Sequence, residues 1–417
     1  MDRTIAPEIK AVEKIDLVAP EVQNLSNENT FIWMKNVPNA TSRVDFYFDA
    51  GTAKNNATLC HLTAGLLFSG TAEMDSTSIH NAFDALGAYM DVGASLEQSV
   101  VSFYALNDQM PKVLDLFLKV MTENCFPENE LTELKADRKQ KLLINLEKVG
   151  FQAQRTFQRQ LFGDSPFSKL TEPNDYDLIQ REEVISFFKK AYLSGLFKVV
   201  LVGDFSKSVA ENIFEKFKPW LRNDNVSLNP NLISQKGELY LEKSDAMQTA
   251  LRVGRLLFTK NHPDFIPFSI LNTIFGDYFG SRLMKNIRED KGYTYGIGSY
   301  VNELKNVGYF VIGSEVGKDV FQPTLIEIRN EMQRLHDELI SEDELSLVRN
   351  YLEGQLLKSA DGPYSLTDLY LNVSFHGLDM DYYNQFLKTL HKIEPKQLQV
   401  LAQKYLRWEE MVVVGVG

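Results

Sequence analysis

The chain has 417 residues, of which 44% are hydrophobic and 24% are charged. This is the composition of a soluble globular protein, and the length predicts two or three domains. The formal net charge of −12 argues against nucleic acid or an anionic membrane as the main partner. No apolar run approaches the roughly 20 residues that a membrane helix needs, and the start lacks the apolar core of a secretion signal. We therefore expect a cytoplasmic protein, or a periplasmic one whose signal has been removed.

The predicted elements follow the same order in both halves. Each half begins with two strands, continues with helices, a hairpin and further helices, and closes with a strand rich in β-branched residues. The strands are expected near 30–35, 43–50, 89–106 (a hairpin) and 199–203, and again near 238–242, 248–257, 293–315 (a hairpin) and 411–415. Because strands and helices are grouped, we expect an α+β fold of two homologous domains, each a mostly antiparallel sheet with helices packed on one face.

Three sequence matches in the same order indicate an internal duplication. The matching segments are ENELTELKADRKQKLL (128–143) with EDELSLVRNYLEGQLL (342–357), AYLSGLFKVVLVG (191–203) with KYLRWEEMVVVG (404–415), and the hairpins that begin at Gly87 and Gly292. Residues 219–236, with Pro230 and several Asn and Ser residues, have the composition of a linker. We therefore place an N-terminal domain at 1–218, a linker at 219–236 and a C-terminal domain at 237–417.

The most informative motif is the segment LCHLTAGLLFSGT at 59–71. A helix that carries His, then Glu and His three and four residues later, places all three side chains on one face. In the inverted zinc motif H-x-x-E-H the histidines bind zinc, the glutamate activates the bound water, and a distant carboxylate is the third protein ligand. The segment resembles the first helix of the pitrilysin/insulinase and mitochondrial processing peptidase family, whose pattern it keeps at Leu59, His61, Phe68, Gly70 and Thr71.

The residues that would bind and use zinc are missing from this motif. Ala64 stands at the position of the catalytic glutamate, and Gly65 stands at that of the second histidine. Counting onward past the segment FPENE at 126–130, which matches the family's F-P-E-x-E, places the cation Lys141 at the position of the third ligand. Only His61 remains, and a single helical histidine is more often a packed residue than a ligand. The sequence therefore predicts no metal site, no cofactor and no catalytic residue in this chain alone.

A metal-independent hydrolase would need a nucleophile beside a base. Cys60 precedes His61, but neighbouring side chains on a helix point about 100° apart and do not form a dyad. The chain has two cysteines, Cys60 and Cys125, which are too few for a disulfide framework or a cysteine zinc site. We expect both to be buried free thiols.

The second half contains the segment GSRLMKNIREDKGYTY at 280–295. It resembles the family's G-x-x-S-R-L…R-E-x-x-G-x-x-Y segment, in which the arginine and the tyrosine bind the substrate backbone, and this assigns the role to Arg288 and Tyr295. A cation and a hydroxyl group near the scissile carbonyl can stabilise the oxyanion that develops there. The plain alternatives are a surface ion pair of Arg288 with Glu289 or Asp290, and a strand aromatic that packs on a helix for Tyr295.

The resemblance covers essentially the whole chain and implies a noncatalytic, substrate-binding subunit of a two-chain zinc endopeptidase. Such a subunit completes the active site of an H-x-x-E-H-bearing homologous partner, which is expected to hold the zinc, and it binds a peptide substrate. The hairpin at 89–102 is where an extended peptide could add as a strand, although Asp91, where family members often carry Asn, is a weak candidate for binding. The alternative is a structural or assembly protein that retains the peptidase fold without peptidase activity. The isolated chain could also form a homodimer.

Overall fold

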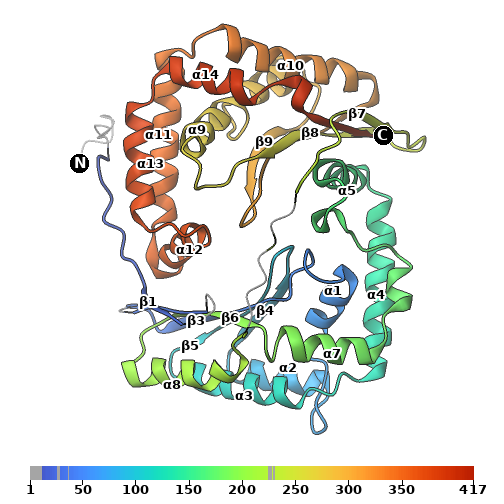
Figure 1. Cartoon of the computed structure of the whole chain (residues 1–417), viewed down its shortest axis with the longest axis vertical. Coiled ribbons are helices and arrows are strands. Elements are labelled where there is room, and N and C mark those ends of the chain that lie inside the picture. The colour runs from blue at the N-terminus through green and yellow to red at the C-terminus, as the bar shows by residue number, and fades with distance from the viewer. Residues whose placement is uncertain (1–11, 26–28, 36, 224–227, 229–230) are drawn as a thin grey trace, which may run out of the picture.

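The computed structural model describes residues 12–25, 29–35, 37–223, 228 and 231–417, so part of the predicted linker lies outside the described residues. Two sheets lie one above the other along the long axis, with helices outside them at both ends, helix α4 (Glu128–Leu146) along one side and helix α11 (Glu342–Ser359) along the other (Figure 1). This arrangement confirms the predicted α+β class with two sheets. No helix of the described part is long and apolar enough to cross a membrane.

The first sheet has six strands in the order β1-β2-β6-β3-β5-β4, and only the pair β2–β6 runs parallel. Its strands are β1 (Glu21–Asn24), β2 (Thr30–Met34), β3 (Thr41–Phe48), β4 (Tyr89–Ala94), β5 (Ser99–Leu106) and β6 (Leu196–Val202). The predicted strands of this half are confirmed. Strand β1 was not predicted, because all four of its side chains are exposed and no apolar alternation marks it.

The second sheet has five strands in the order β7-β11-β8-β10-β9, and only the pair β7–β11 runs parallel. Its strands are β7 (Gly237–Leu241), β8 (Gln248–Leu257), β9 (Ile297–Glu303), β10 (Gly308–Gly317) and β11 (Val412–Val416). All four predicted regions are confirmed. In each half the closing strand lies between two early strands, β6 between β2 and β3 and β11 between β7 and β8, as expected for duplicated units.

Apart from one helix in each half, described below, the helices of each half pack on its own sheet or on one another. The first half contributes α1 (Ala57–Gly65), α2 (Ser76–Ala85), α3 (Met110–Glu123), α4, α5 (Val149–Phe162), α6 (Asp175–Leu178), α7 (Arg181–Ala191) and α8 (Lys207–Phe217). The second contributes α9 (Phe265–Phe275), a π-helix (Met284–Asp290), α10 (Phe321–Asp337), α11, α12 (Gly362–Ser374), α13 (Asp381–Lys392) and α14 (Pro395–Tyr405).

Aromatic side chains fill the core between each sheet and its helices. In the first half Phe117 of α3 packs on Phe46 and Phe103 of the sheet, with ring centroids 5.0 and 4.8 Å apart. In the second half Phe268 of α9 lies 5.9 Å from Phe310 of β10. These rings are fully buried, and each contributes roughly 1.5–3 kcal/mol of burial free energy to folding.

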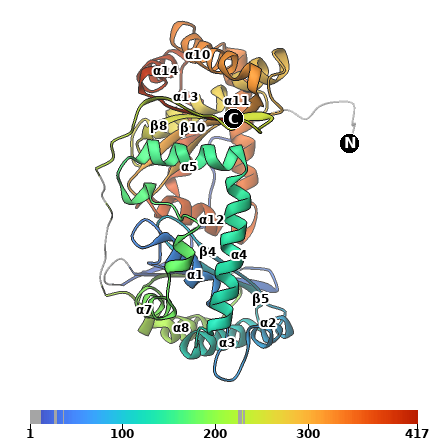
Figure 2. The same ribbon diagram turned by 90° about the vertical axis from the view of Figure 1, so that its right-hand side faces the viewer.

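The two halves exchange helices. Helix α5 belongs to the first half by sequence but packs on β8 and β11, where Phe157 is buried together with Val412 and Val414 (Figure 2). Helix α12 belongs to the second half but packs on β6, where Tyr370 covers Ile32 and its neighbours. The opposite face of each sheet is therefore partly covered by a helix from the other half. The amphipathic pattern of a helix predicts that one of its faces is buried, but it does not show which sheet the helix packs on.

Polar contacts between the halves reinforce this exchange. The guanidinium group of Arg43 on β3 forms two bonds to the Asp368 carboxylate on α12, at 2.6 and 3.3 Å. At the turn of the β4–β5 hairpin, both carboxylate oxygens of Glu97 accept from the backbone N–H of Lys305, at 3.1 and 2.9 Å. Lys305 lies in the turn of the β9–β10 hairpin, so the two equivalent hairpins meet turn to turn.

Candidate functional site

The degenerate zinc motif forms a regular helix, α1. The Asn56 side chain caps its N-terminus by accepting from the Leu59 N–H at 3.1 Å, and Leu62 is fully buried in the core. His61 is half-buried and lines a cavity of about 620 Å³, together with Ala64 and Gly65. The three residues at the family's motif positions therefore do share one site, and the helix forms from its cap and apolar face.

Helix α4 supplies the opposite wall of this cavity. A Cβ atom on Gly65 would lie 2.9 Å from Cδ2 of Leu134 and 3.8 Å from Nη2 of Arg138. Burial lowers the pKa of His61, and the positive charge of Arg138 lowers it further. Three carboxylates of the same helix, those of Glu130, Glu133 and Asp137, also line the cavity. A divalent cation would need carboxylates or neutral donors turned toward it, without a competing cation beside them.

Lys141, which sequence counting placed at the third-ligand position, lies elsewhere on α4. Its ammonium group is exposed and pairs with Asp137 at 2.8 Å, and the residue does not line the His61 cavity. The cation that faces the cavity is Arg138, three residues earlier. Sequence reasoning missed Arg138 because counting fixes the distance along the chain but not the rotation of α4 against α1.

The described residues contain no group of three or more His, Cys, Asp and Glu side chains arranged to hold a metal ion. Cys60 is buried, and burial raises the pKa of its thiol to about 12. Its sulfur lies near the Gly51 carbonyl at 3.7 Å, within the core. The thiol therefore packs as a small apolar group, as expected from sequence, while Cys125 is only half-buried.

Strand β4 forms the open edge of the first sheet beside the same cavity. Met90 and Val92 line the cavity, whereas Asp91 is exposed on the opposite side of the strand. An edge strand offers unpaired N–H and C=O groups to an added strand. The structure thus places a pairing edge next to the degenerate motif.

Arg288 lies in the π-helix, an uncommon conformation that often marks functional segments. Its guanidinium carbon lies 4.6 Å from the ring centroid of Phe279, which is 63% exposed. Within the described part of the chain, Arg288 forms no ion pair with Glu289 or Asp290. The plain alternative from sequence is therefore wrong, because the cation stacks on an exposed ring instead.

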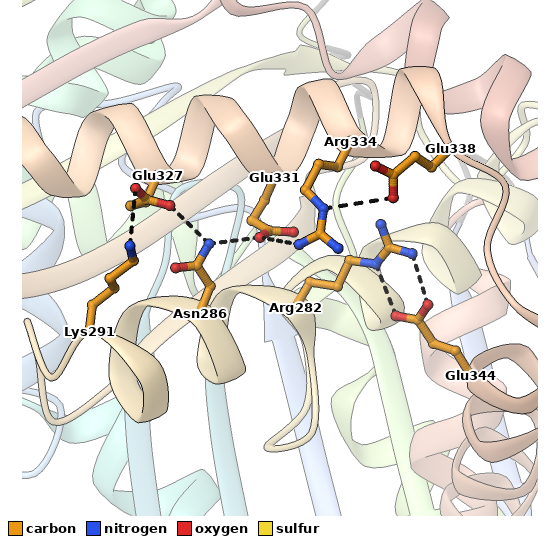
Figure 3. A network of polar contacts seen from close by, with 8 residues as sticks. All are labelled: Arg282, Asn286, Lys291, Glu327, Glu331, Arg334, Glu338 and Glu344. Atoms are coloured by element: carbon orange, nitrogen blue, oxygen red, sulfur yellow. Dashed lines mark hydrogen bonds and ion pairs between the residues drawn. The ribbon is translucent and has the colours of Figure 1, made fainter.

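A polar network anchors the segment that carries Arg288 (Figure 3). Arg282 forms a bidentate pair with Glu344 of α11 at 2.9 and 2.8 Å. The Asn286 amide donates to Glu327 at 3.0 Å and to the buried Glu331 at 2.7 Å, both on α10. Further members of the network are Lys291, Arg334 and Glu338. Because bidentate and charge-assisted bonds fix direction as well as distance, the π-helix is held rigidly against two long helices.

Tyr295 precedes β9, and its side chain is 95% exposed. The loop is fixed by the neighbouring Thr294, whose hydroxyl group donates to the Glu315 carbonyl at 2.8 Å. Tyr295 lines a cavity of about 630 Å³ beside Tyr300 of β9, and Arg288 does not line it. The ring therefore does not pack on a helix, which contradicts the plain alternative, and the two predicted residues are presented on neighbouring segments rather than in one cavity.

Two family models match the chain. The model described as Insulinase (Peptidase family M16) matches residues 30–161, and the model described as Peptidase M16 inactive domain matches residues 178–352. An uncharacterized zinc protease of Rickettsia felis is 23% identical over 322 residues, which cover 73% of this chain and 74% of that protein. A non-peptidase homolog from Helicobacter pylori is 20% identical over 352 residues, which cover 83% of this chain and 81% of that protein.

A solved structure has the same fold over nearly the whole length. The crystal structure of a peptidase M16 inactive domain from Pseudomonas fluorescens superposes with a TM-score of 0.86 at 23% identity, and covers 96% of this chain and 98% of that chain. At this identity the likeness establishes the fold and leaves the activity open.

Proposed function

We propose, from the premise that this chain belongs to the insulinase-type M16 peptidase family, that it is a noncatalytic subunit of a two-chain zinc endopeptidase. In this proposal an H-x-x-E-H-bearing homologue binds the zinc and activates the water. The present chain binds the peptide substrate and contributes Arg288 and Tyr295 to the partner's active site. It needs no cofactor of its own.

The main support for the proposal is the exposure of Tyr295 and the anchoring of the segment that holds Arg288. A residue that serves only packing is normally covered, yet Tyr295 is 95% exposed. The π-helix with Arg288 is anchored through Arg282 and Asn286 to α10 and α11. Rigid donors aimed at a surface are what stabilisation of a developing oxyanion requires, because they lose no reorganisation energy during the reaction.

The open edge of β4 supports the same proposal. A peptide that added to this edge would be held by backbone hydrogen bonds and would lie beside the cavity with His61. In this proposal the cavity, which Arg138 faces, holds no zinc. The edge would then serve to bind and align a peptide for a metal centre in the other subunit.

The experiment is reconstitution of peptide cleavage from two purified chains. The chain alone is expected to be inactive and free of stoichiometric zinc, and cleavage of a fluorogenic peptide is expected when an H-x-x-E-H homologue from the same genome is added. Arg288→Ala and Tyr295→Phe each remove one donor and should lower kcat by about 10²- to 10³-fold. The matched control is Arg329→Ala, since Arg329 also stacks on an aromatic ring, that of Trp408 at 5.7 Å, but on α10; it should leave kcat unchanged.

The same experiment distinguishes the proposed subunit from the alternative, a structural or assembly protein. If the homologue binds this chain but cleavage is indifferent to both Arg288→Ala and Tyr295→Phe, the proposed site is wrong. A stable complex that never gains peptidase activity would instead select the structural or assembly protein.

A further inference from the structure

A cavity of about 700 Å³ lies between the two halves, away from the segments discussed above. From the first half it is lined by residues of β1, β2 and β6, and from the second by Asn306 and His376. Its apolar wall includes Val22, Ile32 and Phe197. This volume lies within the range of cavities that hold small organic ligands.

Lys198 of β6 lines this cavity. Its neighbours across the sheet are Thr30 on β2 and Tyr47 on β3. Its ammonium nitrogen lies 5.4 Å from the centroid of the Tyr47 ring. Among the described residues, Lys198 forms no ion pair and no hydrogen bond through its side chain. A half-buried cation without an anion is costly, and such groups normally acquire a counter-charge.

The carboxylates that line the cavity are already engaged. Asp49 pairs with Lys54 at 2.6 Å and with Arg222 at 3.8 Å. Glu97 accepts from the backbone N–H of Lys305. Among the described residues that line the cavity, neither carboxylate therefore pairs with Lys198.

Electrostatics at Lys198 agree with this geometry. Burial, which is the largest cause, and the charges of Lys305 and Arg222 together lower the pKa of Lys198 to about 8. A bound anion would raise the pKa of Lys198 again, because it would supply a counter-charge inside the cavity.

We propose that this cavity binds a small organic oxyanion, whose phosphate or carboxylate group pairs with Lys198 and whose apolar body lies along Ile32 and Phe197. Because the lining comes from both halves, the ligand contacts both and stabilises their observed arrangement. The proposal is independent of the peptidase partnership, since none of these residues lies in the Arg288 or Tyr295 segments.

The first test measures protection of Lys198 in the wild-type chain. The chain is acetylated with a limiting N-hydroxysuccinimide ester near neutral pH, and the modified lysines are mapped by mass spectrometry. Phenyl phosphate and phenylpropionate are the probes, since they join the same kind of apolar body to the two candidate anions; the more protective one identifies the anion. Saturable protection of Lys198, with none at the exposed Lys207, is expected. Protection no greater than that given by sodium chloride at equal ionic strength would overturn the proposal.

The second test uses Lys198→Met, with Lys207→Met as the matched control. The methionine removes the charge and keeps an unbranched apolar stem, so the variant should fold with an unchanged or higher Tm when no anion is present. The probe's binding, followed by calorimetry, should weaken about tenfold or more in Lys198→Met and remain unchanged in Lys207→Met. Equal affinity in Lys198→Met and wild type would contradict the assignment.

Discussion

The ion pair at Arg43 gives the sharpest prediction for the stability of the fold. Its guanidinium group is 7% exposed and lies between two carboxylates, those of Asp45 on its own strand at 3.0 Å and of Asp368 on α12. The Asp45 side chain is 6% exposed, whereas that of Asp368 is 60% exposed. Arg43→Met should therefore leave the Asp45 carboxylate buried without a cation, whereas the Asp368 carboxylate can turn into water.

This difference in exposure sets the magnitudes. Removal of one partner from a buried pair costs about 3–5 kcal/mol, and we expect that cost for Arg43→Met at neutral pH. Asp368→Asn removes an exposed partner and leaves Arg43 paired with Asp45, so it should cost about 0–1 kcal/mol. The double variant Arg43→Met/Asp45→Asn should recover most of the loss, because no buried charge remains.

The loss should also depend on pH. Burial raises the pKa of Asp45, and Arg43 and a hydrogen bond from Ser102 oppose that shift. Without Arg43 the pKa of Asp45 in the folded state rises further, so the folded state binds the Asp45 proton more tightly than the unfolded state does. A group whose pKa is higher in the folded state than in the unfolded state stabilises the fold at low pH. This stabilisation is lost as the pH rises through the pKa of the folded state. The deficit of Arg43→Met relative to wild type should therefore grow as the pH is raised.

The assay is urea unfolding of wild type, the two single variants and the double variant at several pH values. Tryptophan fluorescence reports on both halves, since Trp33 and Trp220 are buried in the first and Trp408 packs on the core of the second. Equal losses in Arg43→Met and Asp368→Asn, or no recovery in the double variant, would refute the reasoning from exposure.

Two further predictions concern the degenerate motif. Ala64→Glu and Gly65→His together should still give substoichiometric zinc by metal analysis, because Arg138 continues to face the cavity; a fully loaded variant would show that the repulsion was overestimated. Arg138→Gln should raise the pKa of His61 toward its ordinary value in an NMR titration, since a nearby positive charge is removed while burial remains; an unchanged pKa would assign the shift to burial alone.

The strands were predictable because their signal is local. Val199, Val200 and Leu201 form an apolar run that reads as a buried strand, and Gln248–Leu257 was predicted at its observed bounds. The exchange of α5 and α12 was not predictable. The face of α5 that carries Ala153 and Phe157 indicates burial, but periodicity does not identify the sheet that buries it.

The candidate site was predictable only as a set of residues. Motif spacing predicted a helix around His61, which α1 confirms, whereas Arg288, expected on a strand with Tyr295, lies in the π-helix. The spacing could not show that Arg288 stacks on Phe279, or that Arg138 rather than Lys141 faces His61. These relations depend on the rotation and packing of helices, which spacing in the sequence does not encode.

The exchange of helices has a consequence for synthesis on the ribosome. Helix α5 emerges with the first half, yet Phe157 and Leu161 are buried against Val412 and Val414 of β11. During translation part of this apolar surface stays uncovered after β8 has emerged, until residues 412–416 have also left the exit tunnel. The nascent chain therefore presents a prolonged target for chaperones that bind apolar segments, and translation halted before β11 should release a chain prone to aggregation.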